Sequence, residues 1–119
     1  MLTAACHCGA VTLEVKRAPR TLTDCNCSIC RRYGALWAYY RSTSVRIICQ
    51  PEHIESYSWG RKTLRFFRCG VCGCITHHER TKQRSGNTVG VNARNMDPGV
   101  VASTRIRRLD GAKTWRYFD

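Results

Sequence analysis

The pattern of hydrophobic and polar residues along this chain predicts short strands. Apolar and polar side chains alternate over residues 11–15, and residues 35–40 are rich in aromatic side chains, which favour strands. Pro51 and Gly60 separate further runs of this kind. The predicted strands are residues 11–15, 35–40, 45–48, 53–59, 63–68, 75–78, 88–92 and 103–109.

Helices have a small part in this prediction, because no long stretch repeats its apolar residues with a helical period. One helical turn fits residues 28–33, where Gly34 would end it, and Asp97-Pro98-Gly99 indicates a turn. We therefore predict an all-β fold of short antiparallel strands with metal-binding loops. The length of 119 residues fits one domain over residues 1–119.

Composition adds a basic charge and many thiols to this picture. The formal net charge is +12, so the surface should attract nucleic acid, anionic lipid or small anionic substrates. No segment is apolar for long enough to cross a membrane, and the first residues lack a signal-peptide pattern, so we expect a cytoplasmic location. Nine cysteines cannot all pair within the chain, and in a reducing compartment clustered cysteines are metal ligands or reactive thiols.

Two close pairs of cysteines form what we call the cysteine quartet: Cys6, Cys8, Cys69 and Cys72. A close pair of thiolates is half of a tetrahedral site for a soft metal, and two pairs complete a closed one. The second pair has the form of a zinc knuckle, in which glycines free backbone N–H groups to bond the sulfurs. The quartet therefore predicts a structural zinc that ties the start of the chain to its middle.

The cysteine triplet, Cys25, Cys27 and Cys30, brings three sulfurs within six residues. Its spacing leaves two interpretations open. A fourth ligand such as Cys74, Cys49 or a histidine would close the site, whereas an open fourth position would admit water or substrate, as in catalytic zinc.

The histidines and aromatic residues have more ordinary expectations. His7 lies between two quartet cysteines and should point away from their metal. His53 is expected to be an ordinary surface or core histidine rather than part of a site. His77 and His78 alternate along a predicted strand, so at most one of them faces any given site. The larger aromatic residues are expected mostly in the core, while some of them could line a pocket that the sequence does not identify: Trp37, Tyr39, Tyr40, Trp59, Phe66 and Phe67.

Four motifs together resemble a known family. They are CHCGAV at residues 6–11, CNCSICRRYGA at 25–35, FRCGVCG at 67–73 and VNAR at 91–94. In this order they are similar to the glutathione-dependent formaldehyde-activating enzymes, whose domain also occurs in centromere protein V. The resemblance implies a β-tent fold with a structural zinc at the quartet and a catalytic zinc at the triplet.

The resemblance also implies an activity, that of a carbon–sulfur lyase of the S-(hydroxymethyl)glutathione synthase type, which joins formaldehyde to the thiol of glutathione. Glutathione carries net negative charge, and arginine suits carboxylate binding. Arg31, Arg32 and Arg94 are therefore the candidates to hold its carboxylates. Cys74 departs from the family pattern, because a small hydroxyl residue is expected at its position.

Two alternatives from other classes remain. The protein could be a non-catalytic zinc-binding module with two closed sites, or it could bind nucleic acid through its basic surface. Residues 105–108 carry three arginines, which favours the second alternative. The cationic residues are nevertheless scattered and no groove-reading motif is present, which argues against nucleic acid. The sequence gives no information on the oligomeric state.

Overall fold

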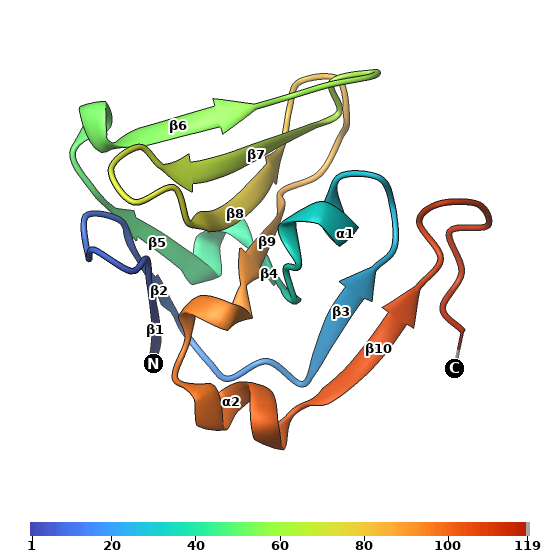
Figure 1. Cartoon of the computed structure of the whole chain (residues 1–119), viewed down its shortest axis with the longest axis horizontal. Coiled ribbons are helices and arrows are strands. Elements are labelled where there is room, and N and C mark those ends of the chain that lie inside the picture. Colours follow the sequence, from blue (N-terminus) through green and yellow to red (C-terminus); the bar gives the residue numbers. More distant parts are fainter. Residues whose placement is uncertain (119) are drawn as a thin grey trace.

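The computed structural model of the chain describes residues 1–118 and contains short strands joined by loops and brief helical turns (Figure 1). The strands are β1 (Leu2–Ala5), β2 (Thr12–Val15), β3 (Thr21–Cys25), β4 (Trp37–Arg41), β5 (Val45–Ile48), β6 (Ile54–Tyr57), β7 (Leu64–Cys69), β8 (Ile75–Arg80), β9 (Thr88–Asn92) and β10 (Arg105–Leu109). The helices are α1 (Cys30–Tyr33) and α2 (Pro98–Ser103), with 3₁₀ turns η1 (Ser42–Ser44), η2 (Pro51–His53) and η3 (Ala93–Asn95). The predicted all-β class is confirmed.

The strands form two sheets. One has three strands in the order β1-β2-β5, and the other has seven in the order β10-β3-β4-β9-β8-β7-β6. Neighbouring strands are antiparallel with one exception, which departs from the predicted pattern: β10 pairs with β3 in parallel. This is possible because the chain travels through the whole sheet before β10 returns beside β3 (Figure 1).

Each of the eight predicted strands overlaps an observed strand, and α1 occurs where a helical turn was predicted, ending at Gly34. Two strands were missed. β1 is short and rich in alanine, and β3 buries the consecutive residues Leu22 and Thr23, so neither shows a clear alternation.

The prediction of a turn at Asp97-Pro98-Gly99 is wrong, because these residues begin α2. The Asp97 side chain caps the helix by accepting a hydrogen bond from the Gly99 N–H, and Pro98 occupies the first turn. Proline tolerates this position because the N–H it lacks would have no partner within the helix.

The apolar residues form two clusters. The larger one contains residues of both sheets, such as Leu13 of β2 and Val91 of β9, together with the quartet residues Cys6 and Cys69. The smaller one surrounds the cysteine triplet and includes Cys25, Cys30, Ala35, Trp37 and Phe66. Both cysteine groups therefore contribute directly to the packing of the protein.

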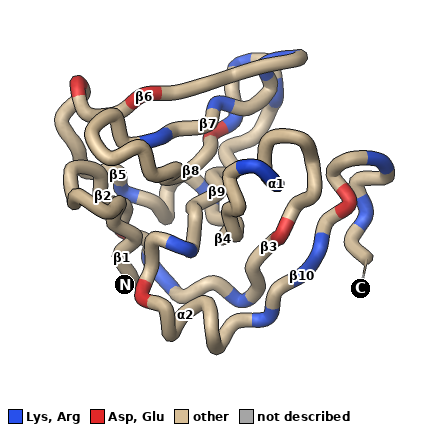
Figure 2. Tube along the Cα trace, in the orientation of Figure 1, with Lys and Arg blue, Asp and Glu red and all other residues tan. Residues whose placement is uncertain are grey.

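Lysine and arginine residues occur on many elements of both sheets, and a group of them follows β10 toward the C-terminus (Figure 2). They do not form one continuous stripe along a single element in this view. Neither helix within residues 1–118 has the length and apolar character that a membrane crossing requires.

Candidate metal centres and the adjoining pocket

The sulfur atoms of the cysteine quartet lie close together, all within 4.8 Å of one another. Cys8 Sγ is 3.7 Å from Cys6 Sγ and 3.6 Å from Cys69 Sγ. A tetrahedral zinc with Zn–S bonds of 2.3 Å separates its sulfurs by about 3.8 Å, whereas a disulfide brings them to about 2.05 Å. The quartet therefore has the arrangement of a closed site that could hold a metal ion.

Backbone N–H groups surround the sulfurs of the quartet. The Val11 N–H donates to Cys6 Sγ at 3.3 Å, and the N–H groups of Val71 and Cys72 donate to Cys69 Sγ at 3.3 and 3.4 Å. Such donors stabilise thiolates, as the knuckle motif predicted.

The turns that supply these donors depend on two glycines. Gly9 and Gly73 follow a quartet cysteine, and their φ angles of 81° and 82° lie in the left-handed region that other residues rarely adopt. The backbone N–H of Cys74, donated to Cys72, is the largest influence that lowers the pKa of Cys72 to about 5. The backbone of both turns thus favours charged sulfur ligands.

Cys74 lies beside the quartet rather than the triplet. Its carbonyl accepts a hydrogen bond from the Cys69 N–H at 2.9 Å, and its side chain packs against the larger core with Cys49. Within residues 1–118, no fourth cysteine, histidine or acidic side chain joins the triplet closely enough to share a metal. Of the two interpretations left by the spacing, the geometry agrees with an open site.

The cysteine triplet is positioned by the end of β3 and the start of α1. Cys25 and Cys30 are buried, whereas Cys27 is partly exposed. The Cys30 N–H donates to Cys27 Sγ at 3.4 Å, and the indole N–H of Trp37 donates to Cys30 Sγ at 3.4 Å. These bonds fix the directions in which the sulfurs of Cys27 and Cys30 point.

The three thiols do not share negative charge equally. Hydrogen bonds from Cys25 and then Cys30 lower the pKa of Cys27 to about 2, while the bond with Cys25 raises the pKa of Cys30. The thiolate is therefore favoured at Cys27, the most exposed sulfur of the three. The triplet could hold a metal ion from one side, with its charge directed outward.

The C-terminal turn packs directly against the triplet. Asn26, between two of its cysteines, donates to Asp110 Oδ1 at 3.1 Å and accepts from the Ala112 N–H at 2.9 Å. Gly111 approaches so closely that a Cβ at this position would lie 2.4 Å from Cys25 Sγ. This contact could not be predicted from the sequence, since nothing in the local pattern links Gly111 to a cysteine so distant in the chain.

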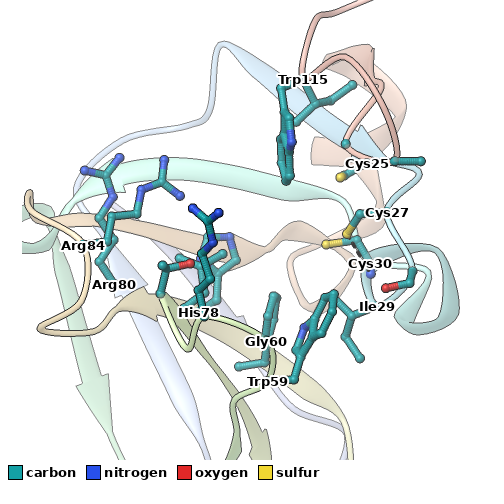
Figure 3. Close-up of a pocket in the computed structure, with 18 of the residues that line it drawn as sticks. Cys25, Cys27, Ile29, Cys30, Trp59, Gly60, His78, Arg80, Arg84 and Trp115 are labelled. Atoms are coloured by element: carbon teal, nitrogen blue, oxygen red, sulfur yellow. Dashed lines mark hydrogen bonds between the residues drawn. The ribbon is translucent and has the colours of Figure 1, made fainter.

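The triplet opens onto a pocket of about 810 Å³ (Figure 3). Aromatic rings line it, among them Trp59 and Trp115, which Figure 3 shows on opposite sides of the cysteines. Tyr39 and Trp59 are 42% and 46% exposed and are among the aromatic residues that line a pocket rather than the core. Trp37, Tyr40 and Phe66 are buried as predicted.

Positive charge enters the pocket from residues that the sequence did not single out. Arg61, Arg80 and Arg84 line it, and among the described residues no aspartate or glutamate does. They come from separate loops and the end of β8, so no local motif marks them. The pocket is suited to an anionic ligand with apolar parts.

The three arginines predicted to hold glutathione do not line this pocket. Arg32 Nη1 donates to the Ser28 carbonyl at 2.7 Å, and Arg94 Nε donates to the Gly34 carbonyl at 2.6 Å. These two side chains therefore brace the residues around α1, and Arg31 is exposed in the same helix.

The histidines divide as the alternation on β8 predicted. His78 lines the pocket, whereas His77 is buried elsewhere, stacked on Phe67 and hydrogen-bonded to Glu79. His7 is exposed, in agreement with its expected direction away from the quartet.

These features define a cysteine-rich β protein with two groups that could each hold a metal ion, consistent with zinc. Residues 1–108 match the family model of the glutathione-dependent formaldehyde-activating enzyme, and the chain belongs to this family. A crystal structure of a Rhodobacter sphaeroides protein superimposes with a TM-score of 0.73 at 31% sequence identity, covering 88% of this chain and 99% of that chain. Membership of the family suggests a formaldehyde-activating function.

Proposed function

We propose that this protein is a zinc-dependent carbon–sulfur lyase that interconverts formaldehyde plus glutathione and S-(hydroxymethyl)glutathione. The observation that carries the proposal is the triplet itself: three sulfurs converge without a fourth protein ligand among the described residues and face a pocket. A site with an open position is typical of catalytic rather than structural zinc.

The ligand chemistry of both groups fits zinc. Sulfur ligands in a tetrahedral arrangement select zinc or iron–sulfur clusters, and the sulfur separations of 3.6 and 3.7 Å in the quartet suit a single ion. Zinc bound at the triplet would supply one chemical effect, the stabilisation of an incoming thiol as its thiolate. We also propose a cytoplasmic location, because a reducing compartment keeps such ligands from oxidation.

The reaction forms one bond between sulfur and carbon. As the glutathione sulfur attacks formaldehyde, the π electrons of the carbonyl move to oxygen, and that oxygen takes the proton which the thiol loses. The reverse reaction breaks the same bond and returns the proton to sulfur. The pocket residues contribute by holding both reactants in place and limiting their motion, which is a large part of catalysis for bimolecular reactions.

The glutathione carboxylates fit the cationic side of the pocket. Arg61, Arg80 and Arg84 line it together with the triplet, so we propose them as the groups that bind these carboxylates. The original assignment to Arg31, Arg32 and Arg94 stays a prediction. It is less favoured because none of these three side chains lines the pocket that the triplet faces.

The test is the rate of adduct formation measured by exchange NMR with ¹³C-formaldehyde and glutathione. Zinc-loaded wild-type protein should accelerate the exchange, and Cys27→Ser should abolish the acceleration. Cys49→Ser is the matched control, because Cys49 belongs to neither cysteine group. Wild-type protein with zinc at both groups that gives only the uncatalysed rate would refute the proposal.

A further inference from the structure

The imidazole of His78 is a buried polar group that the proposed reaction has not yet used. The residue is only 5% exposed, and its Nδ1 has no hydrogen-bond partner among the described residues. Buried polar atoms in native proteins nearly always have a partner, and exceptions often mark functional sites. A core position could be filled by an apolar ring instead, so the presence of histidine needs an explanation.

The sheet is built to hold this ring in one place. His78 on β8 lies opposite Gly90 on β9, and a Cβ at Gly90 would come within 2.2 Å of His78 Nε2. The imidazole therefore extends over β9 into space that the side chain of any residue other than glycine at position 90 would occupy. Trp37 meets its ring edge-on at a centroid distance of 4.6 Å, and Phe66 lies 5.4 Å away.

The same ring lines the pocket shared with the cysteine triplet. Figure 3 shows the three cysteines on one side of the pocket and His78, Arg80 and Arg84 on the other. Trp37 connects the two sides, since its indole N–H bonds Cys30 Sγ while its ring contacts His78. His78 is not among the side chains that converge at the triplet to hold a metal ion. Its position in the pocket suits contact with a bound substrate instead.

The surroundings decide which proton the ring carries. Burial lowers the pKa of His78 to about 4, so the imidazole is neutral near pH 7 and bears a single N–H. A buried N–H without an acceptor is rarer in proteins than an unpaired acceptor. Because Nδ1 is sealed and unpartnered, the proton is favoured on Nε2, the atom that extends over Gly90.

We propose that His78 is a catalytic residue whose Nε2–H donates a hydrogen bond to the aldehyde oxygen as the thiol sulfur attacks, and to the hydroxyl oxygen of the adduct. A neutral imidazole can polarise a carbonyl in this way. His78 keeps its own proton throughout: the carbonyl π pair moves to oxygen, and oxygen takes the proton lost by the thiol. The inference rests on the proposed function and extends it to a residue outside the cysteine motifs.

Kinetics of two variants test the role. His78→Phe fills the same aromatic surroundings without a donor, and it should lower kcat on the order of 100-fold, as loss of one oxyanion donor does. KM for glutathione and the content of two zinc ions per chain should stay as in wild type. His78→Gln restores an N–H donor and should recover most of the lost rate. His53→Gln, at the edge of η2, is the matched control.

A role in packing alone predicts otherwise. It would make His78→Gln at least as harmful as His78→Phe, because the amide replaces a ring within an aromatic cluster. That result, or a wild-type kcat in His78→Phe, would overturn the proposal.

A second measurement is independent of turnover. In protein labelled with ¹⁵N-histidine and loaded with zinc, the stable adduct analogue S-(2-hydroxyethyl)glutathione should shift the Nε2 resonance of His78 and leave that of His53 in place. If this shift occurs in protein that gives no catalysis, the proposed function is wrong while the hydrogen bond stands. If catalysis is present and the His78 resonance does not move, the proposed function stands and this inference is overturned.

Discussion

The two cysteine groups use the same ligand atom, yet the protein surrounds them differently. In the quartet, four sulfurs converge from turns that are 61 residues apart in the chain. In the triplet, three sulfurs come from one short segment, and the rest of their surroundings is a pocket. The two groups therefore differ both in the number of sulfurs that converge and in what lies opposite those sulfurs.

The different connectivity also separates stability from activity. A metal in the quartet would link the first turn of the chain to the turn between β7 and β8, and so hold the two sheets together. A metal in the triplet would close only a local loop that Asn26 and the C-terminal turn already restrain. We therefore expect damage to the quartet to unfold the protein and damage to the triplet to inactivate it.

The largest expected effect separates the groups by stability. Cys69→Ser removes a fully buried quartet ligand and should lower the free energy of unfolding by several kcal/mol, since structural zinc supplies about 10–16 kcal/mol in zinc-finger peptides. Cys27→Ser should change stability far less. Urea denaturation followed by circular dichroism, with zinc content measured in parallel, gives both values. Equal stability of the two variants would break the comparison.

A smaller effect tests how the C-terminal turn supports the open site. Gly111→Ala places a Cβ 2.4 Å from Cys25 Sγ, and overpacking of this kind costs about 1–3 kcal/mol. We expect zinc content to fall from two ions toward one per chain, with the quartet metal retained. Mass spectrometry of the native protein counts the ions, and Lys113→Ala in the same turn is the control. Full retention of both ions would show that the turn does not constrain the triplet.

The sequence predicted the features that depend on local spacing. Cys6 with Cys8, and Cys69 with Cys72, could be paired because close sulfurs suit one metal, and alternation located most of the strands. The return of β10 beside β3 could not be predicted, because parallel pairing depends on the whole path of the chain.

The walls of the pocket were beyond the reach of local patterns for the same reason. Arg80 and Arg84 surround the site together with Trp115 only after the chain has folded, and no periodicity relates them. Arg31 was singled out because it follows Cys30 directly, yet helix α1 leaves it outside the pocket. Residues next to a ligand in the sequence are therefore a poor guide to the side chains that line the pocket around it.

The smallest expected effect concerns how the stability of the protein depends on pH through His78, which lines the pocket beside the triplet. Burial lowers the pKa of His78 to about 4 from its usual 6.5, helped by the positive charges of Arg84 and Arg80 and opposed by Cys27. The unfolded chain therefore binds this proton more readily than the folded protein does. The contribution of the neutral His78 imidazole to the free energy of unfolding is fully present above about pH 6.5 and is lost as the pH falls toward 4.

Comparison with His78→Phe isolates this contribution, because both proteins share every other titrating group. Between pH 7 and pH 5.5, wild-type protein should lose roughly 1 kcal/mol of unfolding free energy relative to the variant. Urea denaturation of the zinc-loaded proteins at the two pH values gives the difference, and the quartet contributes equally to both. If the difference in unfolding free energy between wild type and His78→Phe did not change with pH, His78 would be as well solvated as a surface histidine. The triplet would then lack the buried hydrogen-bond donor that distinguishes its surroundings from those of the quartet.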